Sequence, residues 1–257
     1  MLLTEHQVEW GLMRHPAGRS GAANMAIDAS LLAEAARTGR AFLRLYRFDP
    51  PCLSLGRNEP TVHYDRAAIA RRGLDVVRRP TGGRAVWHEH EVTYAVAAPI
   101  ATFGGLREAY RTIHTRLATA LRRLGADAAL ALERPRAPST ALDTPGSCFA
   151  APVGGEVLVE GRKLVGSAQV REGRAFLQHG SILLAGSQEM LRLVSRERGT
   201  GSGETTLAAV LGRPVSFEEV ADAVAGAWRD EWTPTAPDRP LPSSTACFSD
   251  PAWTWRR

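Results

Sequence analysis

The chain has 257 residues, of which 44% are hydrophobic, and a formal net charge of +5 at pH 7. A chain of this length and composition can bury a full core, so we expect one large domain, or one domain with an appendage, that needs no disulfides to fold. The first ten residues carry charges and no run of eighteen apolar residues occurs, which predicts a cytoplasmic protein with neither a signal peptide nor a membrane span.

The cysteines and the excess of positive charge restrict the possible partners. Cys52, Cys148 and Cys247 are widely spaced, without a C-x-x-C pair or a zinc-type histidine spacing, so we expect neither a disulfide framework nor a metal site. Positive charge suits nucleic acid, an acidic membrane surface or an acidic protein. Because the arginines are scattered and no aromatic-rich motif accompanies them, we expect no nucleic-acid partner, and no membrane partner either.

The first half of the chain is predicted to alternate between helices and short strands. Good helix formers at helical spacing, followed by Gly39 at the C-cap position, indicate the first helix, and period-two alternation indicates the strands. A polar HEHE turn separates the last two strands, and a tight PTGGR turn precedes them. The predicted helices cover residues 24–38 and 64–72, and the predicted strands cover residues 42–48, 52–56, 74–79, 84–88 and 92–98.

The second half begins with the longest amphipathic helix, predicted over residues 106–124 and ended by Gly125. A strand over 127–133 leads into a Pro-, Ser- and Thr-rich segment, residues 133–146, that has the composition of a loop and runs directly to Cys148. Ser216 and Glu219 form a capping box that begins a helix ending at Trp228. Further strands are predicted over residues 156–160, 161–170 and 175–184, with a hairpin turn at Glu160 and Gly161.

Strands in runs, interrupted by helices, predict an α+β fold with a mixed, largely antiparallel sheet flanked by helices rather than regular βαβ winding. We expect one domain over residues 1–232 and a Pro-rich C-terminal tail over residues 233–257. The tail carries Trp253 and Trp255, which could dock on the body of the protein or bind a partner.

Lys163 is the only lysine in a chain that has 32 Lys and Arg residues together. An amine differs from a guanidinium in being a compact donor whose pKa can move, so this position is a candidate catalytic residue. Gly166, Ser167 and Ala168 follow it and would let a ligand approach the backbone closely. The alternative is a solvated charge on a hairpin.

Cys148 stands in GSCFAAP, between the predicted loop and the strands, where a bulky substrate could reach a thiol. It is a candidate nucleophile, although free cysteines are more often small buried hydrophobes.

The segment RRPTGGRAVWH contains Arg79, Gly82, Gly83 and Arg84 and ends at His88. Adjacent glycines offer backbone N–H groups to an anion or carbonyl, but a plain β-turn explains them equally well. The segment RRPTGGRAVWH is not a phosphate-binding P-loop, because it lacks the spaced glycines followed by Lys and Ser or Thr. His88, and His179 next to Gly180 in QHGS, would either line a site or be hydrogen-bonded core histidines.

RRPTGGRAVWH, CFAAP, VEGRKLVGSAQV and LQHGSILL, in this order and spacing, resemble the octanoyltransferase branch (LipM type) of the biotin and lipoate protein ligase (BPL/LPL) family. The most specific element is a cysteine fifteen residues before the lysine of GRK, and the similarity extends from about residue 24 to residue 228. The chain departs from this pattern at Val153, Gly154 and Gly155, whereas Arg84 agrees with the transferase branch because lipoate ligases usually have a third glycine there.

The resemblance implies a BPL/LPL catalytic-domain fold over residues 1–232 with no cofactor. Cys148 takes the position of the family nucleophile and Lys163 that of the family lysine. The substrate-binding residues would be Arg79, Gly82, Gly83, Arg84, His88, Gly166, Ser167, Ala168, His179 and Gly180. The implied reaction moves an octanoyl group from octanoyl acyl carrier protein, through a cysteine thioester, to the lysine of a lipoyl-domain protein, either the glycine cleavage H protein or the E2 of a 2-oxoacid dehydrogenase.

Three other functions remain open. An ATP-dependent lipoate-protein ligase would use Lys163 to bind an acyl-adenylate and would not need Cys148. An octanoyl amidotransferase between lipoyl domains would use both residues with an amide donor. A non-catalytic binding protein on the same scaffold is suggested by the altered Val153–Gly155 segment alone.

Overall fold

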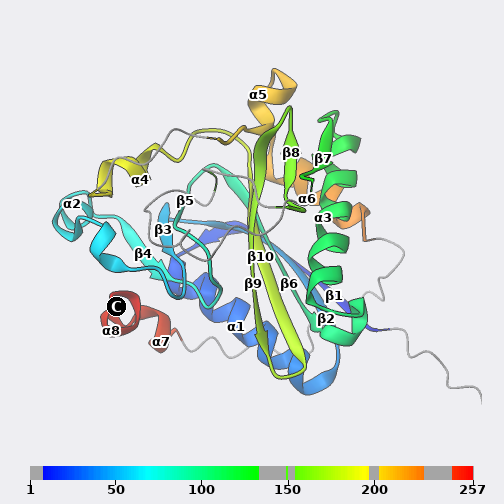
Figure 1. Cartoon of the computed structure of the whole chain (residues 1–257), viewed down its shortest axis with the longest axis horizontal. Helices are drawn as coiled ribbons and strands as arrows, with labels where there is room; N and C mark the ends of the chain where they lie inside the picture. The colour runs from blue at the N-terminus through cyan, green and yellow to red at the C-terminus, as the bar shows by residue number, and fades with distance from the viewer. Residues whose placement is uncertain (1–7, 133–148, 150–153, 197–202, 229–244, 257) are drawn as a thin grey trace, which may run out of the picture.

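The structure is a computed structural model that describes residues 8–132, 149, 154–196, 203–228 and 245–256. Its centre is a seven-stranded sheet of order β1-β2-β6-β10-β9-β8-β7, beside a three-stranded sheet of order β4-β3-β5 (Figure 1). The large sheet comprises β1 (Trp10–Arg19), β2 (Ala41–Phe48), β6 (Glu91–Pro99), β7 (Ala128–Leu130), β8 (Val157–Val159), β9 (Arg162–Glu172) and β10 (Ala175–Leu183). The small sheet comprises β3 (Cys52–Leu55), β4 (Asp75–Arg78) and β5 (Val86–His88).

Pairing in both sheets is mixed. β1 runs parallel to β2 and β4 runs parallel to β3, whereas all other pairs are antiparallel. The predicted α+β class with a mixed, largely antiparallel sheet is therefore confirmed.

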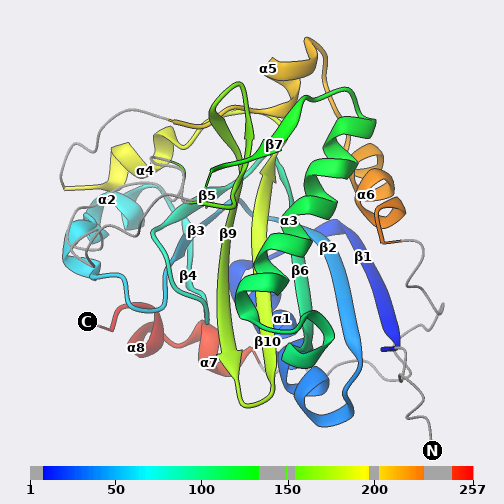
Figure 2. The same ribbon diagram turned by 45° about the vertical axis from the view of Figure 1, so that its right-hand side comes forward.

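Side-chain alternation on the central strands gives the large sheet two apolar faces. On β2, Phe42 and Tyr46 belong to one core cluster, and Leu43 and Leu45 belong to the other. Helix α1 (Gly21–Thr38) packs on the first face, and helices α3 (Leu106–Arg123) and α6 (Phe217–Gly226) pack against the second (Figures 1 and 2). Helix packing on both faces therefore buries the central strands on both sides.

The small sheet lies at one side of the large sheet and carries its own helices. Helix α2 (Arg66–Arg71) packs against helix α4 (Glu189–Val194), and β3 and β5 contribute Leu53, Leu55 and Trp87 to their shared core. The short helices α7 (Ala246–Ser249) and α8 (Pro251–Thr254) pack on β4, and α7 also packs on α1 (Figure 1).

Local sequence signals explain where several elements begin and end. The Ser20 side chain caps the start of α1, and Gly39 ends it with φ of 76°. Ser216 accepts a hydrogen bond from the Glu219 amide at the start of α6, as its capping pattern predicts. Glu160 and Gly161 both have positive φ, 51° and 73°, which makes the predicted hairpin turn between β8 and β9.

Several elements of the structure were not predicted from the sequence. β1 was not predicted because Pro16 and Gly18 interrupt its alternation; the strand tolerates them because it lies at the edge of the sheet and its register shifts between His15 and Arg19. The helices α4, α5 (Leu207–Leu211), α7 and α8 have six residues or fewer and were not predicted either, whereas the six-residue α2 was predicted within residues 64–72. Two 3₁₀ turns, Thr61–His63 and Ile100–Phe103, complete the described elements. The loop predicted over residues 133–146 lies outside the described residues.

No helix in the described part of the chain combines the length and the apolar character that crossing a bilayer requires.

Candidate functional site

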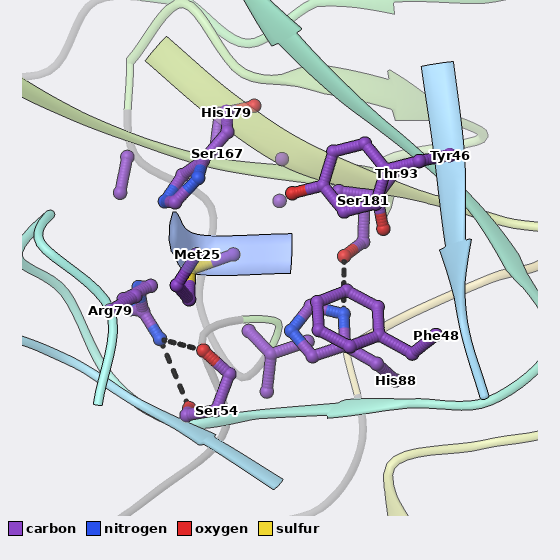
Figure 3. Close-up of a pocket in the computed structure, with 14 residues that line it drawn as sticks. Met25, Tyr46, Phe48, Ser54, Arg79, His88, Thr93, Ser167, His179 and Ser181 are labelled. Atoms are coloured by element: carbon purple, nitrogen blue, oxygen red, sulfur yellow. Dashed lines mark hydrogen bonds between the residues drawn. The ribbon is translucent and has the colours of Figure 1, made fainter. Parts of the chain in front are cut away.

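A cavity lies between the two sheets and the N-terminal part of α1 (Figure 3). Of the predicted binding residues, it is lined by Arg79, His88, Gly166, Ser167, Ala168, His179 and Gly180. Gly82, Gly83 and Arg84 are not among its lining residues; they form the turn beside Arg79. The cavity therefore brings together most of the predicted binding residues from four separate segments.

Arg79 holds the glycine turn in place. Its buried guanidinium donates to the carbonyl oxygens of Gly82 and Arg84, both at 2.7 Å. It also donates to the carbonyl oxygen of Ser54 at 3.0 Å (Figure 3). Gly83 has φ of 86°, in the region that favours glycine. A Cβ on Gly56 would lie 1.8 Å from the Gly83 carbonyl oxygen, so the two backbone segments meet at a distance that excludes any side chain.

His179 connects this turn to α1. Its Nε2 lies 2.6 Å from the Thr81 hydroxyl, and its Nδ1 lies 2.9 Å from an Asp28 carboxylate oxygen. Burial lowers the pKa of His179 although Asp28 acts to raise it, which favours a neutral ring that donates to Asp28 and accepts from Thr81. The ring is buried and lines the cavity, so both sequence alternatives, core histidine and site histidine, apply to it.

Asp28 is the centre of a buried charged cluster beneath the cavity. Its carboxylate accepts hydrogen bonds from Arg44 at 2.7 Å and from the Tyr46 hydroxyl at 2.8 Å, in addition to His179. Burial acts to raise the pKa of Asp28, but Arg44, His179 and Tyr46 together hold it below its usual value. The side chains of Asp28 and Arg44 are both fully buried, and the cluster fixes α1 to the strands that wall the cavity.

His88 is held on the opposite wall. Its Nδ1 lies 2.6 Å from Glu91 Oε1 and 3.2 Å from the Ser181 hydroxyl, and its ring stacks on Phe48 with centroids 4.1 Å apart (Figure 3). His88 is buried and lines the cavity, and these contacts hold its ring in place.

Lys163 forms a buried ion pair with Glu156. Their Nζ and Oε1 atoms are 2.6 Å apart, and the two side chains are 1% and 3% exposed. Lys163 lies near the start of β9, and Glu156 precedes β8 in the same hairpin. The Lys163 backbone is also fixed, because its N–H donates to Gly203 and its carbonyl accepts from Thr205, each at 2.9 Å. The lysine is therefore not the solvated hairpin charge that the sequence left open.

Phe149 connects the ion pair to the cavity. The Lys163 ammonium lies 5.4 Å from the centroid of the Phe149 ring, and a Cβ on Gly166 would lie 2.8 Å from the same ring. Gly166 and Val86 line the cavity, and Phe149 packs with Val86 in one apolar cluster. Gly166 is thus a place of close approach for a side chain of this chain, and the predicted approach of a ligand stays a prediction.

Cys148 lies outside the described residues, directly before Phe149 in the sequence. The two cysteines that are described differ in exposure: Cys52 is buried and Cys247 is exposed. Burial, followed by the nearby Asp75, raises the pKa of the Cys52 thiol well above its usual value, so Cys52 is a poor nucleophile.

A second buried hydrogen-bond cluster supports the other face of the sheet behind the cavity. His114 on α3 lies 2.8 Å from the Ser167 hydroxyl through Nε2, and 2.6 Å from the Gly155 carbonyl oxygen through Nδ1. The Tyr94 hydroxyl also contacts Ser167, at 2.7 Å. Burial lowers the pKa of His114 to about 4, so its ring is neutral at pH 7 and donates to Gly155.

Sequence reasoning missed Glu156 and half of the cavity wall. A single lysine in a buried strand region requires a counterion, and the glutamate across the predicted hairpin turn was the signal that could have indicated Glu156. The other residues come from α1 and from strands that meet only in the folded protein, so no local pattern marks them. They are Met25, Tyr46, Phe48, Ser54, Val86, Thr93 and Ser181.

Comparison with known proteins adds independent information. The family model for the lipoyl protein ligase A/B catalytic domain matches residues 20–229. A relative from Kyrpidia tusciae, named octanoyltransferase LipM, is 41% identical over 237 residues, which cover 84% of this chain and 84% of the relative.

Among solved structures, a candidate lipoate protein ligase from T. acidophilum with bound lipoic acid has a TM-score of 0.75 at 19% identity and covers 97% of this chain and 99% of that one. A bi-partite lipoate protein ligase from Thermoplasma acidophilum, analysed with its E2 lipoyl domain, has a TM-score of 0.68 at 19% identity and covers 97% of this chain and 96% of that one. These two similarities show a shared fold.

Proposed function

This chain belongs to the lipoyl protein ligase A/B catalytic-domain family and is an octanoyltransferase of protein lipoylation, for which we propose a two-step route through a Cys148 thioester. The observation that carries this route is the buried Lys163–Glu156 pair against Phe149, the residue covalently next to Cys148.

In the first step, the Cys148 thiolate attacks the carbonyl carbon of an octanoyl thioester on acyl carrier protein. A new carbon–sulfur bond forms, the carrier's thiolate leaves, and one thioester replaces another at little cost in free energy. A cation near the thiol favours the thiolate, and a donor aimed at the developing oxyanion is typically worth about 3 kcal/mol. We assign Lys163 to this role, held in position by Glu156.

In the second step, the lysine amine of a lipoyl-domain protein attacks the acyl-enzyme. The carbon–nitrogen bond forms, the carbon–sulfur bond breaks, Cys148 leaves as a thiolate, and the amine loses a proton. The product amide is more stable than the thioester, so the transfer proceeds without ATP. The acceptor is a glycine cleavage H protein or the E2 of a 2-oxoacid dehydrogenase, in the cytoplasm.

The cavity supports an acyl substrate. Met25, Phe48 and Val86 supply apolar surface between the predicted binding residues, and each methylene buried there contributes roughly 0.8 kcal/mol. The octanoyl chain would lie along Gly166, Ala168 and Gly180, with its carbonyl toward Phe149 and Lys163. The Gly82–Gly83 turn and the neighbouring Arg84 would border the donor's entry, with Arg79 and His179 holding the turn.

The acyl donor that the protein accepts distinguishes the proposed transferase from the three alternative functions. Purified protein is incubated with an apo lipoyl domain and one of three donors: octanoyl acyl carrier protein, octanoate with ATP, or an octanoylated second lipoyl domain. Mass spectrometry of the acceptor should show transfer from the carrier protein without ATP. Transfer that requires ATP would identify a ligase, and transfer from the lipoyl domain alone would identify an amidotransferase. No transfer from any of the three donors would indicate a binding protein.

A further inference from the structure

The C-terminal segment 245–256 docks on the strand that leads into the glycine turn. The Trp253 indole N–H donates to the carbonyl of Arg78, the last residue of β4, at 2.8 Å. In the opposite direction, the buried Arg78 guanidinium donates to the carbonyls of Thr254 at 3.0 Å and Arg256 at 3.2 Å. The segment, whose helices α7 and α8 lie beside β4 in Figure 1, is therefore bonded to Arg78 in both directions.

Arg78 joins the segment to the loop after β3. Its Nη1 donates to the carbonyls of Gly56 at 2.6 Å, Glu59 at 2.9 Å and Arg57 at 3.2 Å. The Arg256 side chain also reaches the Arg57 carbonyl, at 2.7 Å, while its guanidinium lies 3.8 Å from the centroid of the Trp253 ring. Charge-assisted bonds to backbone carbonyls fix the loop 56–59 against the segment.

The loop 56–59 in turn holds both ends of the glycine turn. The Arg57 amide donates to the Thr81 carbonyl at 2.8 Å, and the Ala85 amide donates to the Glu59 carboxylate at 2.9 Å. Gly56 lies against the Gly83 carbonyl, where a Cβ would not fit. A continuous set of contacts therefore runs from Trp253 through Arg78 and the loop to the turn beside the cavity.

We propose that residues 245–256 form a clamp that positions the Gly82–Gly83 turn, making Trp253 and Arg256 positioning residues for acyl-donor binding. The clamp acts on the backbone geometry at one end of the cavity and touches no substrate. Its effect on donor binding rests on the proposed function, whereas its effect on the loop and the turn does not.

Two matched substitutions within the clamp test this proposal. Trp253→Phe keeps an aromatic ring and removes the N–H that binds the Arg78 carbonyl. Trp255→Phe is the control, because in the described residues the Trp255 ring contacts Arg66 and its N–H donates to no protein acceptor. Hydrogen exchange followed by mass spectrometry reports the amides of Arg57 and Ala85, which bond directly to the turn or to the loop.

We expect Trp253→Phe to raise exchange in peptides covering residues 56–59 and 81–86 by roughly three- to tenfold, the effect of one lost hydrogen bond on local opening, and Trp255→Phe to leave it unchanged. The KM for octanoyl acyl carrier protein should rise by a similar factor with kcat within about twofold. The clamp would be overturned if the change in exchange stayed within residues 245–256 or were equal in the two variants. An unchanged KM in Trp253→Phe would overturn its role in donor binding.

A second variant covers the case in which Trp253→Phe does not fold. Arg256→Ala removes a partly exposed side chain and its bond to the Arg57 carbonyl. It should raise exchange at residues 57–59 by roughly two- to fivefold, and wild-type exchange there would contradict the proposal. If the wild-type protein transfers no octanoyl group, the proposed function fails, and the exchange comparison still decides whether the clamp holds the turn.

Discussion

The two ends of the cavity use buried charges differently. At the turn end, Arg79 donates to backbone carbonyls of the glycine turn. Asp28 is bonded to Arg44, Tyr46 and His179, and these bonds hold α1 against β2 and β10. At the other end, Lys163 and Glu156 form a pair within one hairpin, against the neighbour of Cys148. We therefore propose that the turn end shapes the binding site and that the lysine end supplies the chemistry.

The largest effect should come from removing the lysine charge. Lys163→Met keeps the length of the side chain and should lower octanoyl transfer by roughly 10²- to 10³-fold, because the proposed route needs this cation beside the reacting thioester. It should also destabilise the fold by about 3–5 kcal/mol, since Glu156 loses its lysine partner in a buried site. Transfer assays and urea denaturation measure the two effects.

Two further variants separate chemistry from stability at this end. Lys163→Met combined with Glu156→Gln should recover most of the lost stability but not the lost activity. Lys163→Arg keeps the charge, but the planar guanidinium does not match the compact amine, so transfer should still fall at least tenfold. Wild-type activity in Lys163→Arg would mean that the lone lysine is a compositional accident.

At the turn end, Asp28→Asn should act mainly on stability. Removing the carboxylate leaves the buried Arg44 without its counterion, which should cost about 3 kcal/mol of unfolding free energy in urea. Asp222→Asn is the matched control, because Asp222 pairs with Arg14 where both side chains are largely exposed, and its loss should cost less than about 1 kcal/mol. If the Asp28→Asn protein folded but had a much lower kcat with an unchanged KM, the turn end would also contribute to the chemistry, and the proposed difference between the two ends would be wrong.

The sequence predicted which residues gather at the cavity better than it predicted what they do. Arg79 and His179 were identified as site residues from their motifs, but their partners decide their roles, and Asp28 is 151 positions from His179. Long-range partners leave no local periodicity, so the Asp28 cluster could not be predicted. Regular elements such as α3 were predicted closely because an apolar stripe and a terminal glycine are local signals, whereas β1 depends on pairing with β2.

Acid should weaken the support behind the cavity. Burial lowers the pKa of His114 to about 4, whereas the unfolded chain takes up that proton near its usual value of 6.5. The unfolded state therefore binds more protons below pH 6.5, so the contribution of this histidine is complete at pH 7 and declines as the pH falls toward 4. Between pH 6.5 and 5 the loss should be about 2 kcal/mol.

Chemical denaturation across this pH range measures the effect. His114→Gln should show a shallower dependence than the wild-type protein, because it lacks the titrating ring. The same dependence in both proteins would show that folding does not change the pKa of His114.

The smallest expected effect distinguishes two glycines. Gly166→Ala places a methyl group against Phe149, where a Cβ would lie 2.8 Å from the ring, and should cost about 1–2 kcal/mol and raise the KM for the acyl donor. Gly82→Ala should leave the stability nearly unchanged, since no atom of the described residues other than those of Gly82 and its chain neighbours lies within 4 Å of the added Cβ. Equal losses of unfolding free energy in the two variants would show that the contact between Gly166 and Phe149 does not matter for stability.

The most direct measurement of the central claim is the intact mass of the protein after incubation with octanoyl acyl carrier protein alone. Wild-type protein and Cys247→Ala, which changes the exposed thiol, should each gain one octanoyl group that neutral hydroxylamine removes, and Cys148→Ala should gain none. A hydroxylamine-sensitive octanoyl group on Cys148→Ala, or transfer to a lipoyl domain at the wild-type rate in that variant, would contradict the thioester route.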